Sequence, residues 1–406
     1  MEGSRLLRTL RLTNFLSYGP EGTEIELEPL NVLIGPNACG KSNLLEAISL
    51  LKAAPSDISA PIVAGGGMPE WAWKGARPLD AIDLEIGTIV FTRKDWPNLD
   101  YRFRLASVGQ QVHVVEESIR QTKRIRPARR RDPHLYVQGE RGAELLRFAG
   151  LDNDGTPKYD PEPLRPADID PRRSILSQRK DPDHYPELSF LGRALREIEL
   201  FRACNLGHES PLRGPQRADL TSYFLLEDGR NLGLVLSNML LDFPPAKKRL
   251  LAEMRRFCEY IEDITTRIVA GTVEMSIHER GFRQSTPSTR LSDGTLRYLC
   301  LLTILCHPSP PPLVCIEDPE IGLHPDILPN VAELLVEASR RMQLVVTTHS
   351  DVLVSALSSV PEAVLVCERD DSGSHLKRLE PDRLKEWLEK YSLGELWRMG
   401  ETGGNP

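Results

Sequence analysis

The sequence lacks the features of membrane and exported proteins. No apolar run approaches the roughly 20 residues that a membrane-spanning helix needs, and residues 1–11 are polar and basic with no apolar stretch after them. None of the seven cysteines belongs to a CxxC pair, which argues against a structural zinc site, and several lie in apolar runs, where free thiols are common. We therefore expect a protein without a signal peptide or membrane span that works in the reducing cytoplasm.

Internal repeats and sustained heptads are also missing. Prolines are frequent between residues 92 and 287, which argues against a long coiled-coil arm. Hydrophobic residues make up 40% and charged residues 27% of the 406 residues, which is typical of a globular protein with one or two domains. The net charge of -7 argues against nucleic acid bound over the whole surface, but it allows a local basic patch.

Both ends of the chain alternate apolar strands with helices. An apolar run at residues 31–34 precedes a glycine turn and an amphipathic helix, and strand–helix units recur after residue 291. This pattern predicts an α/β fold with a mostly parallel sheet covered on both faces. Between the two ends, residues 102–115 are predicted to form meandering strands, residues 152–186 long loops, and residues 187–200 and 231–260 helices.

A complete phosphate-binding motif lies between the first apolar run and its helix. It reads Gly35-Pro36-Asn37-Ala38-Cys39-Gly40-Lys41-Ser42, followed by Asn43. The glycines let backbone N–H groups turn towards phosphate oxygens, and the helix adds its positive end. We expect Lys41 to reach the β- and γ-phosphates of a nucleotide and the Ser42 hydroxyl to bind Mg²⁺.

A second motif places carboxylates at the end of an apolar strand. Glu317 and Asp318 follow residues 313–316, at the edge of the sheet where the phosphates are expected. One carboxylate is suited to the Mg²⁺ site and the next to polarising the attacking water. By position, Glu317 is the metal ligand and Asp318 the base, with Glu320 as an alternative base.

Two further polar segments complete the set. Ser292 and Gly294 open the helix before the Glu317 strand, where a hydroxyl, an N–H and a helix dipole favour an anion, although the same residues also suit a simple N-cap. His349 follows the next strand and ends on the phosphate side of the same sheet. We expect it to hydrogen-bond the γ-phosphate or the attacking water.

Together these motifs resemble the ABC-class ATPases, and within them the branch that contains RecF, the structural-maintenance-of-chromosomes proteins and the overcoming-lysogenization-defect (OLD) family. The resemblance is specific over about residues 1–55 and 288–367, including the run from Ile316 to Pro325. It implies an ABC-ATPase-like P-loop fold with an antiparallel β lobe. It also implies ATP and Mg²⁺ as cofactors, and a homodimer or higher homo-oligomer. ATP would lie between Lys41 of one copy and Ser292 and Gly294 of the other, with His349 as the switch histidine.

The resemblance suggests a division of the chain into four parts. Residues 1–95 would form an N-terminal ATPase lobe, residues 96–287 a mixed, largely helical insertion, residues 288–368 a C-terminal ATPase lobe and residues 369–406 a tail. Many OLD-like proteins carry a C-terminal nuclease domain of the topoisomerase–primase type, which residues 350–406 do not resemble. We therefore expect a separately encoded effector or nuclease, and read Glu368, Asp370 and Asp371 as a solvated turn.

Two positions depart from the family or lack an obvious match. Asp318 stands where the family usually has glutamate, which raises the alternative of slow hydrolysis by an ATP-binding scaffold. The glutamine that senses the γ-phosphate has no clear equivalent, and Gln178 is one candidate.

The segment from Arg120 to Arg131 holds seven basic residues and could contact DNA or RNA phosphates, or serve as a solvated loop or subunit contact.

The remaining alternative is a transporter's nucleotide-binding subunit. The Leu323-His324-Pro325 run argues against it, as does the absence of an aromatic residue just upstream of the P-loop. We expect the ATP cycle to gate a DNA-related process, either antiphage defence or DNA repair.

Overall fold

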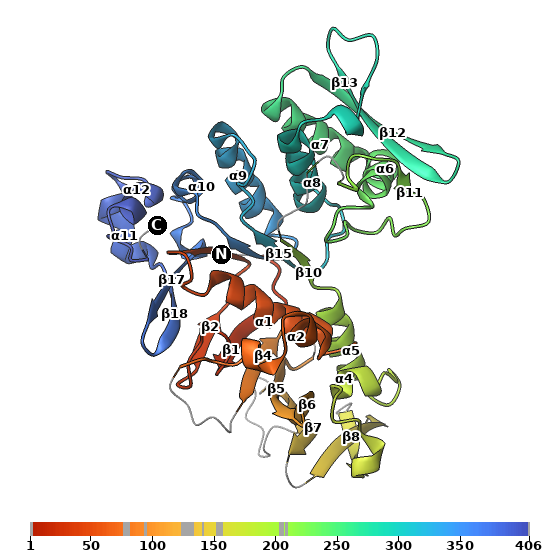
Figure 1. The fold of residues 1–406 in the computed structure, drawn as a ribbon, viewed down its shortest axis with the longest axis vertical. Coiled ribbons are helices and arrows are strands. Elements are labelled where there is room, and N and C mark those ends of the chain that lie inside the picture. The colour runs from red at the N-terminus through yellow and green to blue at the C-terminus, as the bar shows by residue number, and fades with distance from the viewer. Residues whose placement is uncertain are drawn as a thin grey trace.

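The computed structural model describes residues 3–75, 82–92, 96–122, 134–139, 142–151, 157–202, 207 and 210–404. These residues form three sheets and the helices that pack on them (Figure 1). The segment from Arg120 to Arg131 lies outside the described residues except for Arg120 to Thr122.

The central sheet has the strand order β10-β15-β16-β3-β17-β18. Neighbours from β10 to β17 are parallel, and β18 is antiparallel to β17. The strands are β3 (Leu30–Ile34), β10 (Glu199–Phe201), β15 (Leu313–Glu317), β16 (Gln343–Thr347), β17 (Val364–Asp370) and β18 (Gly373–Arg378). The carboxyl ends of β10, β15, β16 and β3 therefore meet at one edge, as the sequence predicts for the P-loop and the acidic pair.

Each face of this sheet is covered by a separate core. Val32 and Val346 face the core shared with α8 (Asp293–Leu305), α9 (Leu328–Ala338) and α10 (Asp351–Ala356). Leu33 and Val345 face the core shared with α1 (Lys41–Ala53) and the large antiparallel sheet. Figure 1 shows α9 and α10 on one side of the sheet and α1 on the other. Burial of both faces explains why these strands are continuously apolar.

An eight-stranded antiparallel sheet lies beyond α1, in the order β2-β1-β4-β5-β6-β7-β8-β9. Its strands are β1 (Leu7–Thr13), β2 (Thr23–Glu26), β4 (Asp83–Val90), β5 (Leu99–Val108), β6 (Gln111–Gln121), β7 (His134–Gly139), β8 (Gly142–Leu151) and β9 (Pro157–Leu164). The sequence suggested a domain boundary at residue 95, but β4 before it and β5 after it are neighbouring strands of this one sheet. Short helices α2 (Ala60–Ala64) and α3 (Met68–Trp71) follow α1.

The expected loop at residues 152–186 was partly wrong, because β9 is a strand there. Among the described strands it pairs with β8 alone, at the edge of the sheet, and it contains Pro157, Pro161 and Pro163. Proline has no backbone N–H to donate, and an edge strand can point that position towards its unpaired side. Few hydrogen bonds between the strands are then lost. After β9 come α4 (Ile175–Gln178) and α5 (Pro186–Arg196), and α5 contacts α1.

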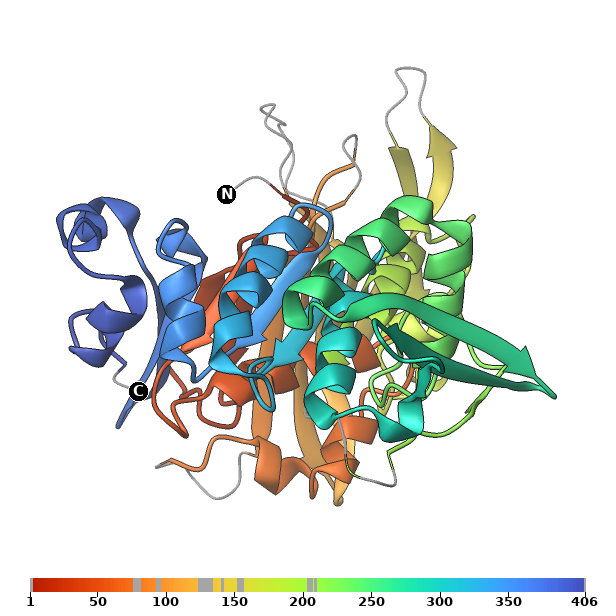
Figure 2. The ribbon, with the colours of Figure 1, turned by 90° about the horizontal axis from the view of Figure 1, so that it is seen from above.

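A third group of elements surrounds α8. It contains α6 (Leu232–Asp242), α7 (Pro244–Phe257), β11 (Gln216–Arg217), β12 (Ile261–Val269), β13 (Thr272–Glu279) and β14 (Thr286–Pro287). The helical prediction for residues 231–260 is confirmed, but Pro244 and Pro245 divide it into two helices because proline fits only the first turn of a helix. The β12–β13 hairpin projects from this group (Figure 2).

The helices after β18 pack beside the central sheet. Helices α11 (Pro381–Leu388) and α12 (Leu393–Arg398) follow β18, and α12 contacts α10. Leu393, Leu396 and Trp397 are fully buried, at the i, i+3 and i+4 spacing of one helix face. Short 3₁₀ turns cover Pro166–Asp168, Ser288–Arg290, Pro325–Ile327 and Pro361–Ala363. No helix in the described ranges is both long and apolar enough to cross a membrane.

Candidate functional site

The loop between β3 and α1 has the backbone shape of a phosphate cradle. Gly35, Ala38 and Gly40 have φ angles of 141°, 62° and 115°. A Cβ on Gly35 would lie 2.2 Å from the carbonyl oxygen of Cys367, so only glycine fits there. The Lys41 ammonium donates to the carbonyl oxygens of Gly35 at 2.7 Å and Pro36 at 3.0 Å, which holds its positive charge inside the loop.

The outer side of the loop is fixed by donors from other elements. The Tyr18 hydroxyl donates to the carbonyl oxygen of Gly40 at 3.1 Å, and the Ser374 hydroxyl donates to that of Cys39 at 2.5 Å. The Asn43 amide donates to the Ser17 hydroxyl at 2.7 Å. Complete burial raises the pKa of Tyr18 well above its ordinary value, so its hydroxyl remains a donor. These bonds fix the carbonyls of Cys39 and Gly40, whereas those of Gly35 and Pro36 accept from Lys41.

Ser42 and Glu317 meet at the carboxyl edge of the central sheet. The Ser42 hydroxyl donates to a carboxylate oxygen of Glu317 at 2.5 Å. A hydroxyl and a carboxylate are the oxygen ligands that Mg²⁺ prefers, so these two residues fit the predicted metal site. The side chains come from α1 and β15, which the parallel sheet brings together.

Asp318 follows Glu317 in a strained conformation. Its φ angle is 44°, which is unusual for a residue other than glycine. The Thr347 hydroxyl donates to its carboxylate at 3.1 Å, and Arg297 donates to its backbone carbonyl at 3.0 Å. These contacts hold Asp318 beside the end of β16.

Glu320 and His349 are joined through the segment after β16. One carboxylate oxygen of Glu320 accepts from the Thr348 hydroxyl and from the backbone N–H of His349, both at 2.7 Å. The His349 side chain is exposed. Glu320 therefore orients the backbone that carries His349 through one carboxylate oxygen, whereas its other oxygen, Oε2, is buried without a hydrogen-bond partner among the described residues.

Arg202 also stands at the carboxyl edge, although the sequence analysis did not select it. The last paired residues of β10 and β15 are Phe201 and Ile316, so Arg202 and Glu317 follow neighbouring parallel strands. Arg202 donates to Glu46 of α1 at 2.6 Å, and this hydrogen bond, with the charges of Glu46 and Glu317, raises the pKa of Arg202. The strand before Arg202 has three residues, which is too short to show the alternation of apolar and polar residues by which a strand is recognised in a sequence. The sequence analysis therefore did not place Arg202 at the end of a strand.

The signature residues Ser292 and Gly294 lie elsewhere in the same chain. Ser292 is the exposed N-cap of α8 and accepts from the Thr295 N–H at 3.1 Å. Arg213 donates to the Leu291 carbonyl at 2.6 Å and pairs with Asp293. In Figure 1, α8 packs with α6 and α7, across the central sheet from α1. The structure therefore does not bring these residues to the P-loop of their own chain.

Gln178 is engaged in a local turn. Its amide accepts from the Asp170 N–H at 2.9 Å and donates to the carbonyl oxygens of Asp170 and Arg173 at 3.2 and 2.8 Å. These bonds close residues 170–178 beside α4. The structure does not bring Gln178 to the P-loop, and its role as the γ-phosphate sensor stays a prediction.

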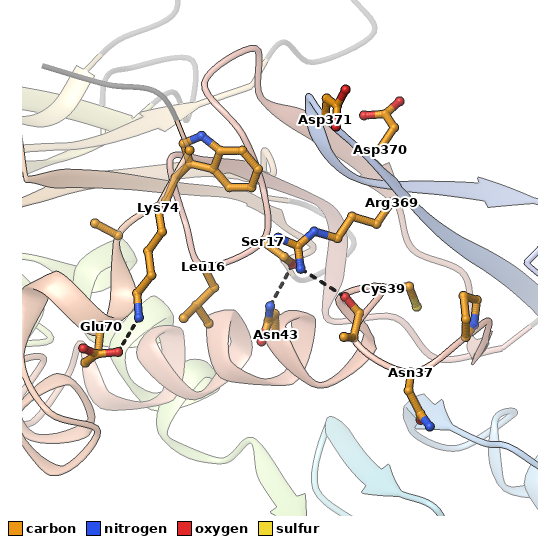
Figure 3. Close-up of a pocket in the computed structure, with 15 residues that line it drawn as sticks. Leu16, Ser17, Asn37, Cys39, Asn43, Glu70, Lys74, Arg369, Asp370 and Asp371 are labelled. Atoms are coloured by element: carbon orange, nitrogen blue, oxygen red, sulfur yellow. Dashed lines mark hydrogen bonds and ion pairs between the residues drawn. The ribbon is translucent and has the colours of Figure 1, made fainter.

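A cavity of about 820 Å³ opens beside the P-loop (Figure 3). One side of the cavity is formed by the loop and α1, through Pro36, Asn37, Ala38, Cys39 and Asn43. The remaining lining residues come from other segments and are Leu16, Ser17, Glu70, Ala72, Trp73, Lys74, Gly75, Arg369, Asp370 and Asp371. The half-buried indole of Trp73 supplies an apolar, aromatic wall, and Arg369 donates to the Ala38 carbonyl at 3.4 Å. Such a cavity suits a nucleoside attached to phosphates in the loop. The sequence analysis missed Trp73 because it considered an aromatic residue only upstream of the P-loop.

The fold and the loop geometry define an α/β P-loop ATPase domain. The chain belongs to the family described as "AAA domain, putative AbiEii toxin, Type IV TA system", which matches residues 30–355. P-loop ATPases of this kind generally use ATP and Mg²⁺. No curated protein matches the chain.

Solved structures of Smc heads are similar in fold. The SmcHead bound to the C-winged helix domain of ScpA is 15% identical with a TM-score of 0.58, over 93% of this chain and 99% of that one. A second similar structure is the Smc head domain with an extended coiled coil, bound to the C-terminal domain of ScpA, from Pyrococcus furiosus. It is 14% identical with a TM-score of 0.54, and the match covers 95% of this chain and 99% of that one. At these identities the likeness shows the fold alone.

Proposed function

We propose that the protein hydrolyses ATP as an ABC-type ATPase of the OLD- and RecF-like branch, and that two copies close around the nucleotide. The observation that carries this proposal is the contact between Ser42 and Glu317 beside Lys41. A loop built for phosphate, a hydroxyl–carboxylate pair suited to Mg²⁺ and an adjacent carboxylate are the parts that ATP hydrolysis needs.

Each residue has a distinct task in this scheme. The loop N–H groups and Lys41 hold the β- and γ-phosphates, and Ser42 and Glu317 hold Mg²⁺, which neutralises phosphate charge when bound. Asp318 accepts a proton from the attacking water, while Thr347 fixes its carboxylate. His349, oriented by Glu320, donates to the γ-phosphate. Water attacks phosphorus, the bond to the β-phosphate oxygen breaks, and ADP and phosphate are released.

The separation of Ser292 from the P-loop supports a site shared by two chains. In a dimer, the exposed end of α8 from one copy would add its Ser292 hydroxyl and Gly294 N–H to the γ-phosphate held by the other. ATP would then favour the closed dimer because only that state makes both sets of contacts. Loss of the γ-phosphate would remove this preference.

We infer that this cycle gates a DNA-related process in the cytoplasm, in antiphage defence or DNA repair, through a separately encoded effector. The resemblance to the OLD and RecF branch supports a DNA-related role, and the family description names a toxin of a type IV toxin–antitoxin system. DNA or RNA contact would use the basic segment Arg120 to Arg131, of which Arg120 alone among the arginines and lysines is described. DNA-stimulated turnover would support this role.

A second candidate is an ATP-dependent scaffold that hydrolyses slowly. The short carboxylate of Asp318, at a φ angle of 44° and bound to Thr347, favours this alternative. The two candidates differ in turnover and not in ATP-dependent dimerisation.

A mixing experiment tests the shared site. Lys41→Ala removes the P-loop cation, and Ser292→Arg blocks the signature end of α8, so each variant alone should be inactive. In a mixed dimer, the intact P-loop of the Ser292→Arg copy faces the intact signature of the Lys41→Ala copy, and phosphate release should return. Ser107→Arg, on an exposed position of β5, is the matched control and should not change activity. No recovery on mixing, despite mixed dimers in native mass spectra, would contradict a shared site.

A further inference from the structure

Two reduced thiols touch at the back of the phosphate-binding loop. Cys39 belongs to the loop, and Cys367 lies on β17. The Cys367 thiol donates to the carbonyl oxygen of Cys39 at 3.1 Å, and it is near enough to the Cys39 thiol to shift its pKa. Both are free cysteines and both are buried. The pair is therefore close enough for the two sulfurs to react with each other.

The surroundings of Cys39 favour its thiolate form. The hydrogen bond from Cys367 and the positive charge of Lys41 lower the pKa of Cys39 below its ordinary value. The Lys41 ammonium lies 3.9 Å from the Cys39 sulfur. The same hydrogen bond, together with burial, raises the pKa of Cys367. The thiolate is the nucleophilic form of cysteine, so Cys39 attacks first and Cys367 acts as the neutral partner.

Cys39 is only 2% exposed, and it borders a cavity. Cys39 lines the 820 Å³ cavity beside the loop, the same space that suits the nucleotide. A bound nucleotide would therefore block small molecules from reaching Cys39 through this cavity.

We propose that Cys39 is an oxidative modification site that reacts with a hydroperoxide, and that Cys367 resolves it as an intramolecular disulfide. In the first step, the Cys39 sulfur bonds to one peroxide oxygen, the O–O bond breaks, and the leaving oxygen takes a proton as water or an alcohol. In the second step, the Cys367 sulfur bonds to that of Cys39, the S–O bond breaks, and hydroxide leaves as water with the proton of Cys367. Two thiols are oxidised, and the peroxide accepts two electrons.

The disulfide closes the loop against the sheet. A disulfide requires Cβ atoms about 3.8 Å apart and a fixed dihedral angle. β17 is held between β3 and β18, and the loop already packs directly on it at Gly35, so the loop rather than the strand moves. Cys39 then turns away from the cavity, and its part of the loop no longer presents N–H groups to phosphate. This consequence rests on the proposed ATP site, whereas the sulfur chemistry does not.

The experiment treats the full-length reduced protein with hydrogen peroxide, with and without Mg²⁺-ATP. Peptide mass spectrometry under non-reducing conditions reads the disulfide, and binding of a fluorescent ATP analogue is measured before and after dithiothreitol. Cys367→Ser keeps a hydrogen-bond donor but cannot resolve the oxidised sulfur. Cys258→Ser, at the end of α7, is the matched control.

The expected result is a Cys39–Cys367 linked peptide in the wild type and in Cys258→Ser, reduced in amount by Mg²⁺-ATP, with loss of nucleotide binding that dithiothreitol reverses. Cys367→Ser should instead accumulate sulfenic acid on Cys39, trapped by dimedone. An unmodified Cys39 in peroxide-treated wild type would overturn the proposal, and a disulfide that leaves nucleotide binding unchanged would overturn its predicted effect on the loop. If the untreated reduced protein failed to bind nucleotide, the proposed function would fail, while the peptide readout would still decide whether the disulfide forms.

Discussion

The Ser42 hydroxyl and the Glu317 carboxylate lie 2.5 Å apart, although 275 positions separate them in the sequence. Ser42 lies in the first turn of α1 and Glu317 ends β15, and the order of the parallel strands brings them to the same edge. The contact therefore ties the two ends of the chain into one site.

Glu317→Gln tests the metal role of this pair. The substitution keeps the shape but removes the negative charge, so the Mg²⁺ concentration for half-maximal turnover should rise by about 10–100-fold. Phosphate release measured across Mg²⁺ concentrations checks this, with Glu333→Gln on the exposed side of α9 as the control. An unchanged Mg²⁺ dependence would remove Glu317 from the metal site.

Asp318→Asn and Glu320→Gln separate the two candidate bases. Loss of a general base typically costs about 10²–10⁴-fold in rate, so Asp318→Asn should bind ATP but turn over at that reduced rate. Glu320→Gln should keep most activity, because its carbonyl oxygen still accepts from Thr348 and His349. Single-turnover rates measure both. The opposite ranking would assign the base to Glu320.

Trp73→Ala tests the wall of the cavity beside the P-loop. Aromatic stacking on a nucleobase contributes about 1–3 kcal/mol, so the dissociation constant for ATP should rise, while Trp73→Phe should retain affinity. Calorimetric titration of ATP and of inorganic triphosphate distinguishes base contact from phosphate contact. Trp387→Ala, on exposed α11, is the control. Equal weakening for ATP and triphosphate would argue against stacking.

Glu117 predicts a pH dependence of stability. Burial raises its pKa from 4.5 to about 7, despite hydrogen bonds from Ser174, Ile175 and Tyr101. The folded state therefore keeps the proton that the unfolded state loses, and the contribution of Glu117 to stability decreases as pH rises from 4.5 to about 7. Above that range its contribution is constant.

Thermal unfolding of the wild type and Glu117→Gln across this pH range measures the effect. The glutamine cannot ionise, so its unfolding temperature should fall less with rising pH than that of the wild type. Glu144→Gln, exposed on β8, should follow the wild type. Parallel curves for wild type and Glu117→Gln would contradict the burial argument.

The parts predicted best from the sequence are those with local signals. The apolar run before Gly35, the helix after Lys41 and the strand before Glu317 each combine a strong period with a motif, and the structure confirms the parallel sheet they imply. The roles of the individual site residues stay predictions.

The features missed depend on contacts between distant segments. The edge strand β9 tolerates prolines that suggest a loop, and Arg202 follows a strand too short to show a period. Trp73 reaches the cavity only because α2 and α3 bring the chain back to the P-loop. Trp397 is buried because α12 packs against α10. The polar residues around it near the C-terminus gave no sign of this packing in the sequence.

The most direct measurement of the central claim is phosphate release by the purified protein with Mg²⁺-ATP, beside Lys41→Ala and a Lys385→Ala control on exposed α11. We predict turnover by the wild type and by Lys385→Ala, and none above background by Lys41→Ala, because Lys41 places its ammonium inside the P-loop. Wild-type protein that binds ATP but releases no more phosphate than Lys41→Ala would contradict the ATPase assignment.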